Sequence, residues 1–338
     1  MKHSNVAFFI PHRGCPNQCS FCNQKTISGA QNAPSPEEIA SACRQALEQV
    51  KDPANTEIAF FGGSFTAIPR EEMLLYLRAA APFVGKGRFS GIRVSTRPDA
   101  VDREILDLLK EHGVTAVELG AQSMDDMVLE LNGRGHTAQD VRSAAELIRE
   151  YGFSFGLQMM TGLFGERKES AYKTAEELIR LMPDTVRVYP TVVLKGTRLG
   201  ELFKAGQYAP PGLEETVELC AGLLDLFEEA GIPVIRLGLH ASREVEEQFL
   251  AGAYHPALRE LCEARRYRER VDRALDGLPP GEYEFKVHPR CLSKALGQKR
   301  ENIEWFAKRG YTILVTPAQG IDPLNVKIAG RKEGSGCF

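Results

Sequence analysis

The chain has 338 residues, 43% of them hydrophobic and 26% charged, and its formal net charge is -3 at pH 7. This balance indicates an ordinary globular protein with a sizeable core, and the length suggests about two domains. No apolar run approaches the ~20 residues of a membrane span, and the first one, residues 6–10, is too short for a signal-peptide core. We therefore expect a cytoplasmic protein with no membrane partner.

Short apolar or β-branched runs alternate with longer helical patterns in the first two thirds of the chain. We predict strands at residues 6–10, 57–61, 91–95, 116–119, 153–158 and 185–189. Apolar residues recur at a spacing near 3.6 in the segments between them, which predicts helices at residues 36–50, 70–81, 102–111, 138–151 and 169–181. This alternation indicates a parallel α/β sheet, either a partial barrel or an open doubly wound sheet. In both architectures the active site lies at the carboxyl ends of the strands.

Three cysteines follow the first predicted strand. Cys15, Cys19 and Cys22 form the pattern C-x3-C-x2-C, and the aromatic Phe21 precedes the last of them. Three thiolates on one loop can bind three irons of a [4Fe–4S] cubane and leave the fourth iron open for chemistry. A zinc site with His12 as a fourth ligand, an electron-transfer cluster whose fourth cysteine is not nearby, and free structural cysteines are the alternatives.

The cysteine loop and the motifs after the following strands resemble the radical S-adenosylmethionine (SAM) superfamily over about residues 5–200. The resemblance implies a partial (β/α)6 barrel, which we assign to residues 1–245, with a small α+β domain at residues 246–338. It also implies a [4Fe–4S] cluster that receives an electron from an external donor and cleaves SAM. The resulting 5′-deoxyadenosyl radical then abstracts hydrogen from a substrate.

The same resemblance implies residues that hold SAM. Gly62, Gly63 and Ser64 follow the second strand and are similar to the glycine motif that binds the SAM amino group, where glycine allows a close approach of the backbone. Ser95 ends the third strand at a position where relatives have a carboxylate that contacts the ribose. Gln158 ends the fifth strand, where relatives have Asp or His. These two positions depart from the family pattern.

Gln122 and Arg134 have the spacing found in the oxygen-independent coproporphyrinogen III oxidase branch of the superfamily. There the two residues face the SAM carboxylate, and a planar guanidinium suits this role because it can bond both oxygens. The resemblance thus assigns Gln122 and Arg134 to the cofactor, together with Phe21 beside the cysteines. A lone arginine in a loop is otherwise an ordinary solvated charge.

Other segments are similar to the catalytic subunit of Elongator, which modifies the wobble uridine of tRNA. They are TRPD at residues 96–99 and RVYP at residues 187–190. From this likeness we predict that Tyr189 and Lys195 lie near the substrate in catalytic roles. The cysteine spacing is shorter than in that subunit, and residues after 245 leave little room for its acetyltransferase domain. We therefore place the chain beside that family.

The last third of the chain differs in rhythm and charge. We predict helices at residues 213–230, 243–250, 255–275 and 301–309, strands at 283–287 and 311–315, and a possible strand at 234–239. Residues 261–338 contain 15 Lys or Arg and 10 Asp or Glu, whereas the preceding residues carry a net charge of -8. Basic runs at residues 265–270 and 286–300 could bind RNA phosphates, or could form the solvated face of a helix.

Three functions follow from these observations. The favoured one is a radical SAM oxidoreductase or transferase that modifies RNA, with tRNA as its substrate. The second is a radical SAM enzyme that acts on a small molecule or tetrapyrrole. The third is a non-catalytic carrier of a cluster or haem, or a redox sensor, which the departures at Ser95 and Gln158 keep open.

Overall fold

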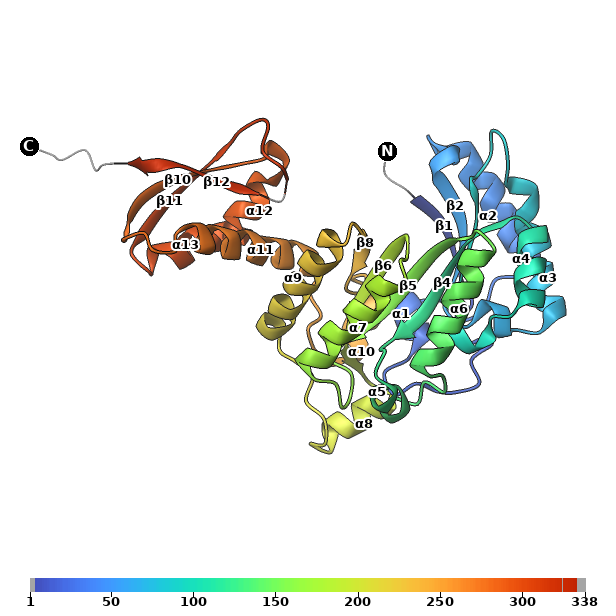
Figure 1. Cartoon of the computed structure of the whole chain (residues 1–338). Helices are drawn as coiled ribbons and strands as arrows, with labels where there is room; N and C mark the ends of the chain where they lie inside the picture. Colours follow the sequence, from blue (N-terminus) through green and yellow to red (C-terminus); the bar gives the residue numbers. More distant parts are fainter. Residues whose placement is uncertain (1–3, 324, 333–338) are drawn as a thin grey trace, which may run out of the picture. The chain divides into compact units, whose positions relative to one another are not determined.

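The computed structural model describes residues 4–323 and 325–332, and the chain forms two compact units, each with its own sheet (Figure 1). Unit 1 comprises the residues up to Gly212 together with Leu226–Tyr254. Unit 2 comprises Leu213–Asp225 together with the residues from His255 onward. The predicted domain boundary at residue 245 stays a prediction.

Unit 1 is built on a sheet of seven parallel strands. These are β1 (Ser4–Phe9), β2 (Thr56–Phe61), β3 (Gly91–Thr96), β4 (Val114–Gln122), β5 (Ser154–Thr161), β6 (Thr185–Pro190) and β8 (Val234–Leu237). They lie side by side in chain order, whereas the strand order of a doubly wound sheet reverses at a switch point. The predicted partial barrel is therefore confirmed, and the possible strand at 234–239 is its seventh member.

The longer helices of unit 1 connect consecutive strands. They are α2 (Pro36–Gln49), α3 (Arg70–Ala80), α4 (Arg103–Glu111), α6 (Ala138–Glu150) and α7 (Lys168–Arg180). A capping box of Ser35 and Glu38 opens α2. Strand β6 shows how the sheet divides its faces: Val186 and Val188 are buried, and the intervening Arg187 and Tyr189 line a cavity on the other face.

Shorter elements complete unit 1. The helices are α1 (Gln24–Ser28), α5 (Asp126–Leu131), α8 (Arg198–Lys204) and α10 (Arg243–Gln248). Strands β7 (Val192–Leu194) and β9 (Phe249–Gly252) pair antiparallel, so the helix predicted at residues 243–250 is too long. Phe249 leaves the helix because it pairs with Leu194, a tertiary contact that local periodicity does not reveal.

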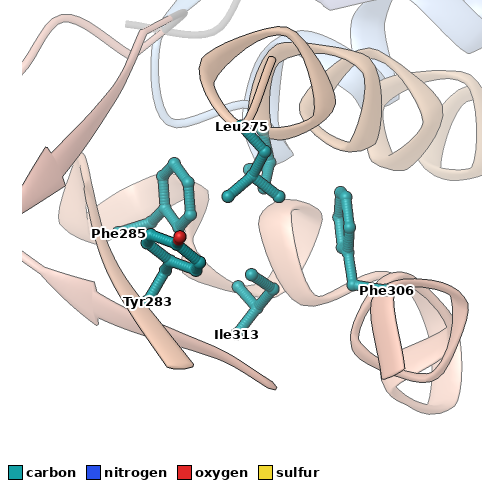
Figure 2. Packing of buried hydrophobic residues seen from close by; sticks show 6 residues of the cluster. Leu275, Tyr283, Phe285, Phe306 and Ile313 are labelled. Atoms are coloured by element: carbon teal, nitrogen blue, oxygen red, sulfur yellow. The ribbon is translucent and has the colours of Figure 1, made fainter. Parts of the chain in front are cut away.

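Unit 2 is the predicted α+β part. Its sheet has the order β11 (Tyr311–Pro317), β10 (Gly281–Val287), β12 (Val326–Lys332), and its helices are α11 (Leu258–Ala274), α12 (Leu292–Leu296), α13 (Glu301–Ala307) and the first part of α9 (Leu213–Glu229). Strand β12 was not predicted. Figure 2 shows the core of unit 2, where Leu275, Tyr283, Phe285, Phe306 and Ile313 pack together. Among the described helices of either unit, none has the length and apolar character needed to cross a bilayer.

Candidate active site

The carboxyl ends of the unit 1 strands surround a cavity of about 470 Å³. Most of the residues predicted for the site line it, although they come from segments far apart in the chain. They are Cys15, Cys19, Phe21, Cys22, Gly62, Gly63, Ser95, Gln122, Arg134, Gln158 and Tyr189. This is the edge at which α/β proteins place their ligands.

Two predicted residues lie elsewhere. Ser64 is fully buried, and its hydroxyl lies 2.8 Å from that of Thr96 and accepts a hydrogen bond from the backbone of Arg97. Lys195 is exposed, and its Nζ donates to the carbonyl oxygen of Glu247 at 2.9 Å. Ser64 thus joins two strand ends, and Lys195 lies outside the residues that line the cavity. Their predicted roles in binding and catalysis stay predictions.

The cysteine loop brings three free thiols to the cavity. All three are half-buried, and the backbone N–H of Cys22 donates to the carbonyl of Cys19 at 3.1 Å. Burial, together with the neighbouring thiols of Cys19 and Cys15, raises the pKa of Cys22 to about 12. The guanidinium of Arg134 lies 3.3 Å from the sulfur of Cys19. Thiolates in this loop therefore need positive partners, which Arg134 and iron can provide.

This donor set fits an iron–sulfur cluster better than a single metal ion. In residues 4–323 and 325–332, no three His, Cys, Asp or Glu side chains converge as the ligands of one zinc ion must. Each thiolate of a cubane binds a different iron, so the three need no common point. The Nε2 of His12, the fourth ligand of the zinc alternative, already accepts a hydrogen bond from the backbone of Gln24 at 3.1 Å.

Arg134 also offers a donor for a ligand. Its Nη2 donates to the carbonyl oxygen of Gly120 at 2.7 Å, but its buried Nε has no hydrogen-bond partner among the described residues. A buried guanidinium N–H without an acceptor is costly. The site therefore fits a cofactor that brings an anionic or hydrogen-bonding group, such as the carboxylate of SAM.

The glycine motif after β2 packs directly on the cysteine loop. A Cβ atom on Gly63 would lie 2.2 Å from the carbonyl oxygen of Arg13, and one on Gly14 would lie 2.3 Å from that of Ser64. The N–H of Gly63 donates to the side chain of Gln24 at 2.7 Å. These glycines allow two backbone segments to approach each other, and this close approach fixes the position of the thiols.

Gln122 adopts a strained conformation at the end of β4. Its φ is +66°, in the left-handed region, and the pairing of β4 with β5 is irregular at this point. Such a conformation costs a non-glycine residue of order 1–3 kcal/mol and is often found at functional sites. A Cβ atom on Gly120 would lie 2.9 Å from the Nε2 of Gln122 and 3.4 Å from the Nη2 of Arg134. The structure thus brings Gln122 and Arg134 together across Gly120.

Ser95 and Gln158, the two departures from the family pattern, contact each other. The Nε2 of Gln158 donates to the hydroxyl of Ser95 at 3.4 Å and to a carboxylate oxygen of Glu118 at 2.9 Å. Glu118 lies on β4, between the strands of the other two residues. The longer side chain of Gln158 therefore reaches across β4 to the short hydroxyl of Ser95.

The sequence analysis missed a buried ionic network below these residues. Glu118 is 1% exposed and accepts hydrogen bonds from Arg93 at 3.2 Å and from Arg187 at 2.9 and 3.0 Å. Arg93 also pairs with Glu57 at 2.7 Å. A signal for this network was present, because these charges of both signs interrupt predicted buried strands and a buried charge requires a partner.

Comparisons with known proteins agree with this architecture. Residues 9–178 match the radical SAM superfamily, and residues 183–270 match the radical SAM C-terminal domain. The tRNA uridine(34) acetyltransferase of Methanocaldococcus jannaschii is 29% identical over 194 residues, which cover 51% of this chain and 36% of that protein. Human Elongator complex protein 3 is 29% identical over 248 residues, which cover 66% of this chain and 44% of that protein. The chain thus spans less than half the length of both relatives.

A solved structure shows the same fold. The Elp3 protein of Methanocaldococcus infernus superimposes with a TM-score of 0.62 at 23% sequence identity. The superposition covers 80% of this chain and 63% of that one.

Proposed function

We propose that this chain, which belongs to the radical SAM superfamily, is an enzyme that modifies transfer RNA in the cytoplasm. The observation that carries the proposal is the meeting of Cys15, Cys19, Cys22 and Arg134 at one cavity. Family members use SAM and a [4Fe–4S] cluster. The substrate class follows the curated relatives, several of which are named as tRNA uridine(34) enzymes.

In this proposal the three thiolates hold the cluster, and Gln122 and Arg134 hold the carboxylate of SAM. The guanidinium of Arg134 suits both neighbours, because one of its nitrogens faces Cys19 and its Nε remains for an acceptor. When bound and reduced by an external donor, the cluster supplies the electron that cleaves SAM. The chain positions the cofactor and excludes competing reactions.

Tyr189 is the residue we assign to the substrate side of the cavity. It packs against the cluster of Val128, Met160 and Leu163, as Phe21 does. Burial raises the pKa of Tyr189, so its phenol keeps its proton at neutral pH. The hydroxyl can therefore donate a hydrogen bond to a substrate group that enters the cavity.

The RNA-binding part of the proposal rests on only some of the basic residues that the sequence suggests. On α11, Arg265 bonds Glu269 at 2.6 Å. Arg266 and Arg270 share Asp225 of α9, at 2.6 and 2.7 Å. These three cations are neutralised within unit 2, so the predicted run at residues 265–270 offers a phosphate little free charge beyond that of Arg268.

We assign the phosphate contacts to a group that we call the Trp305 patch. It comprises Arg268, Lys299, Arg300 and Trp305, and the guanidinium carbon of Arg268 lies 5.2 Å from the centre of the Trp305 ring. Arg309 also lies over this ring, at 4.3 Å, but it pairs with Asp272 and is left out of the phosphate contacts. Arg268 has no ion pair among the described residues. Lys299 and Arg300 are exposed and have φ values of +48° and +66°. Two consecutive left-handed cations are the kind of strain found at binding sites.

The test is 5′-deoxyadenosine formation by the anaerobic, reconstituted protein with dithionite and SAM. We expect the wild type to form it and a Cys15→Ala, Cys19→Ala, Cys22→Ala variant to form none, and we expect tRNA to accelerate it. Stimulation by a metabolite extract and not by tRNA would overturn the RNA assignment. A cluster that forms without any turnover of SAM, with tRNA or extract present, would indicate a carrier or sensor.

A further inference from the structure

Two arginines stand directly opposite each other on the last two strands of the unit 1 sheet. Arg187 of β6 is the register partner of Arg236 of β8. Residues paired in this way point to the same face, and like charges opposed across two strands destabilise a sheet. Arg187 lines the cavity, and Arg236, which is not among the lining residues, lies beside it on the next strand.

Only one of these arginines has a counter-charge. Arg187 bonds both oxygens of Glu118, whose carboxylate also accepts hydrogen bonds from Arg93 and Gln158. The half-buried Arg236 donates from Nε to the carbonyl oxygen of Gly238 at 2.9 Å and has no ion pair among the described residues. The four hydrogen bonds occupy both oxygens of Glu118, so the positive charge of Arg236 is left over beside this wall.

Two further groups surround this charge. His240 follows β8 and lines the cavity, as does Tyr189 of β6. Burial lowers the pKa of Arg236, and the neighbouring Arg187 lowers it further. Burial also lowers the pKa of His240, and Arg236 and Arg187 add to that effect. The wall and the adjacent Arg236 thus present more positive charge than the carboxylates among the described residues neutralise.

We propose that the wall formed by Tyr189, Arg187 and His240 binds a phosphate group of the substrate, and that the charge of Arg236, beside Arg187 on β8, selects for phosphate. The inference rests on the proposed function, because a nucleotide of RNA that enters the cavity brings its own phosphate. A guanidinium matches phosphate oxygens in pairs, and a bound anion offsets the repulsion between the two arginines. The carboxylate of SAM is assigned to Gln122, on β4, and β5 and β6 separate that strand from β8.

A purely structural role for Arg236 and a role in ligand binding predict different effects of Arg236→Met on Tm. If the arginine only anchors the turn at Gly238, Arg236→Met removes a hydrogen bond and lowers Tm. If it serves a ligand, the same change removes one of two opposed charges, and Tm stays the same or rises. Residues kept for function commonly reduce stability in this way.

The experiment uses the full reconstituted chain with SAM bound and compares the affinities for uridine 5′-monophosphate and uridine. We expect the wild type to bind the monophosphate at least tenfold more tightly than uridine, and inorganic phosphate to compete. Arg236→Met loses this preference without a fall in Tm. Arg103→Met, which removes an exposed arginine of α4 paired with Glu150, keeps it.

Equal preference for the monophosphate in the wild type and in Arg236→Met would overturn the proposal. So would an Arg236→Met variant that binds SAM more weakly but keeps its preference for the monophosphate. Should Arg236→Met lower both Tm and the preference, Arg236→Lys decides. Partial recovery of the preference supports a role of the positive charge in selecting phosphate, and no recovery overturns the proposal in favour of an anchor. Because binding is measured without turnover, failure here and failure of 5′-deoxyadenosine formation are separate results.

Discussion

The cavity-facing side of the unit 1 sheet carries buried charges, whereas the covered side of the unit 2 sheet carries aromatic and aliphatic residues. In unit 1, Glu118 pairs with Arg93 and Arg187 below the cavity. In unit 2, Phe285 and Ile313 occupy the equivalent alternating positions of their strands and are almost fully buried. In both sheets successive side chains point to opposite faces, so the alternation is the same. The kind of residue on the covered face, charged or apolar, is what distinguishes the site from the scaffold.

This difference has an energetic side. Buried ion pairs contribute little net stability, because desolvation of the charges offsets their attraction. Buried apolar groups contribute about 25 cal/mol for each Å² removed from water. We infer that unit 1 keeps its charges for the ligands that they position, whereas unit 2 is stabilised by its apolar core.

The sharpest way to test the comparison is Glu118→Ala, which leaves Arg93 and Arg187 buried without their shared counter-charge. We expect a loss of ~3–5 kcal/mol in the free energy of unfolding, measured by urea denaturation, since removing one partner strands the other charges. Glu104→Ala, which breaks a surface pair with Arg70, should leave the midpoint unchanged. Equal effects of the two changes would contradict the importance of the buried network.

Leu275→Ala tests the scaffold side. The side chain is 3% exposed in the unit 2 core, and such truncations cost ~2–5 kcal/mol through lost burial and a residual cavity. Below the unfolding temperature, formation of 5′-deoxyadenosine in the absence of RNA should remain at the wild-type rate. A tenfold loss of that rate in the folded variant would show that unit 2 contributes to SAM cleavage.

Gly63→Ala separates backbone packing from backbone strain. The added methyl group would meet the carbonyl oxygen of Arg13, so we expect the iron content after reconstitution to fall by more than half. Gly87→Ala is the control, because φ is +77° there but nothing lies within 4 Å of the new atom. Only the strain of ~1 kcal/mol should remain in the control. Equal iron loading in both variants would argue against the interlocked loops.

The smallest expected effect concerns the Trp305 patch. Replacement of Lys299 and Arg300 by Gln should weaken tRNA binding a few-fold and reduce the slope of log affinity against log salt by ~1 for each lost phosphate contact. Arg265→Gln should change neither quantity, because Arg265 already bonds Glu269. A larger effect from Arg265→Gln would return the RNA surface to α11.

The sequence predicted the features that depend on local pattern. The strand rhythm and the cysteine loop are encoded within short windows, so the α/β sheet and the three thiols could be anticipated. The other predicted residues around the cavity came from the resemblance to the radical SAM superfamily. The turn of Phe249 into a strand and the pairing of Arg266 with Asp225 depend on residues more than 40 positions away. Arg236 was missed for the same reason, because its position opposite Arg187 exists only in the folded sheet.

The order of the strands in the unit 1 sheet is also the order in which they are synthesised. Each strand pairs with the one synthesised before it, so the sheet can grow as the chain leaves the ribosome. Synthesis at about 5–20 residues per second separates Cys22 from Arg134 by roughly 6–22 seconds. During that interval the thiols are present without the guanidinium that faces Cys19 in the finished protein. The full set of side chains that meet at this cavity therefore exists only in the later part of synthesis.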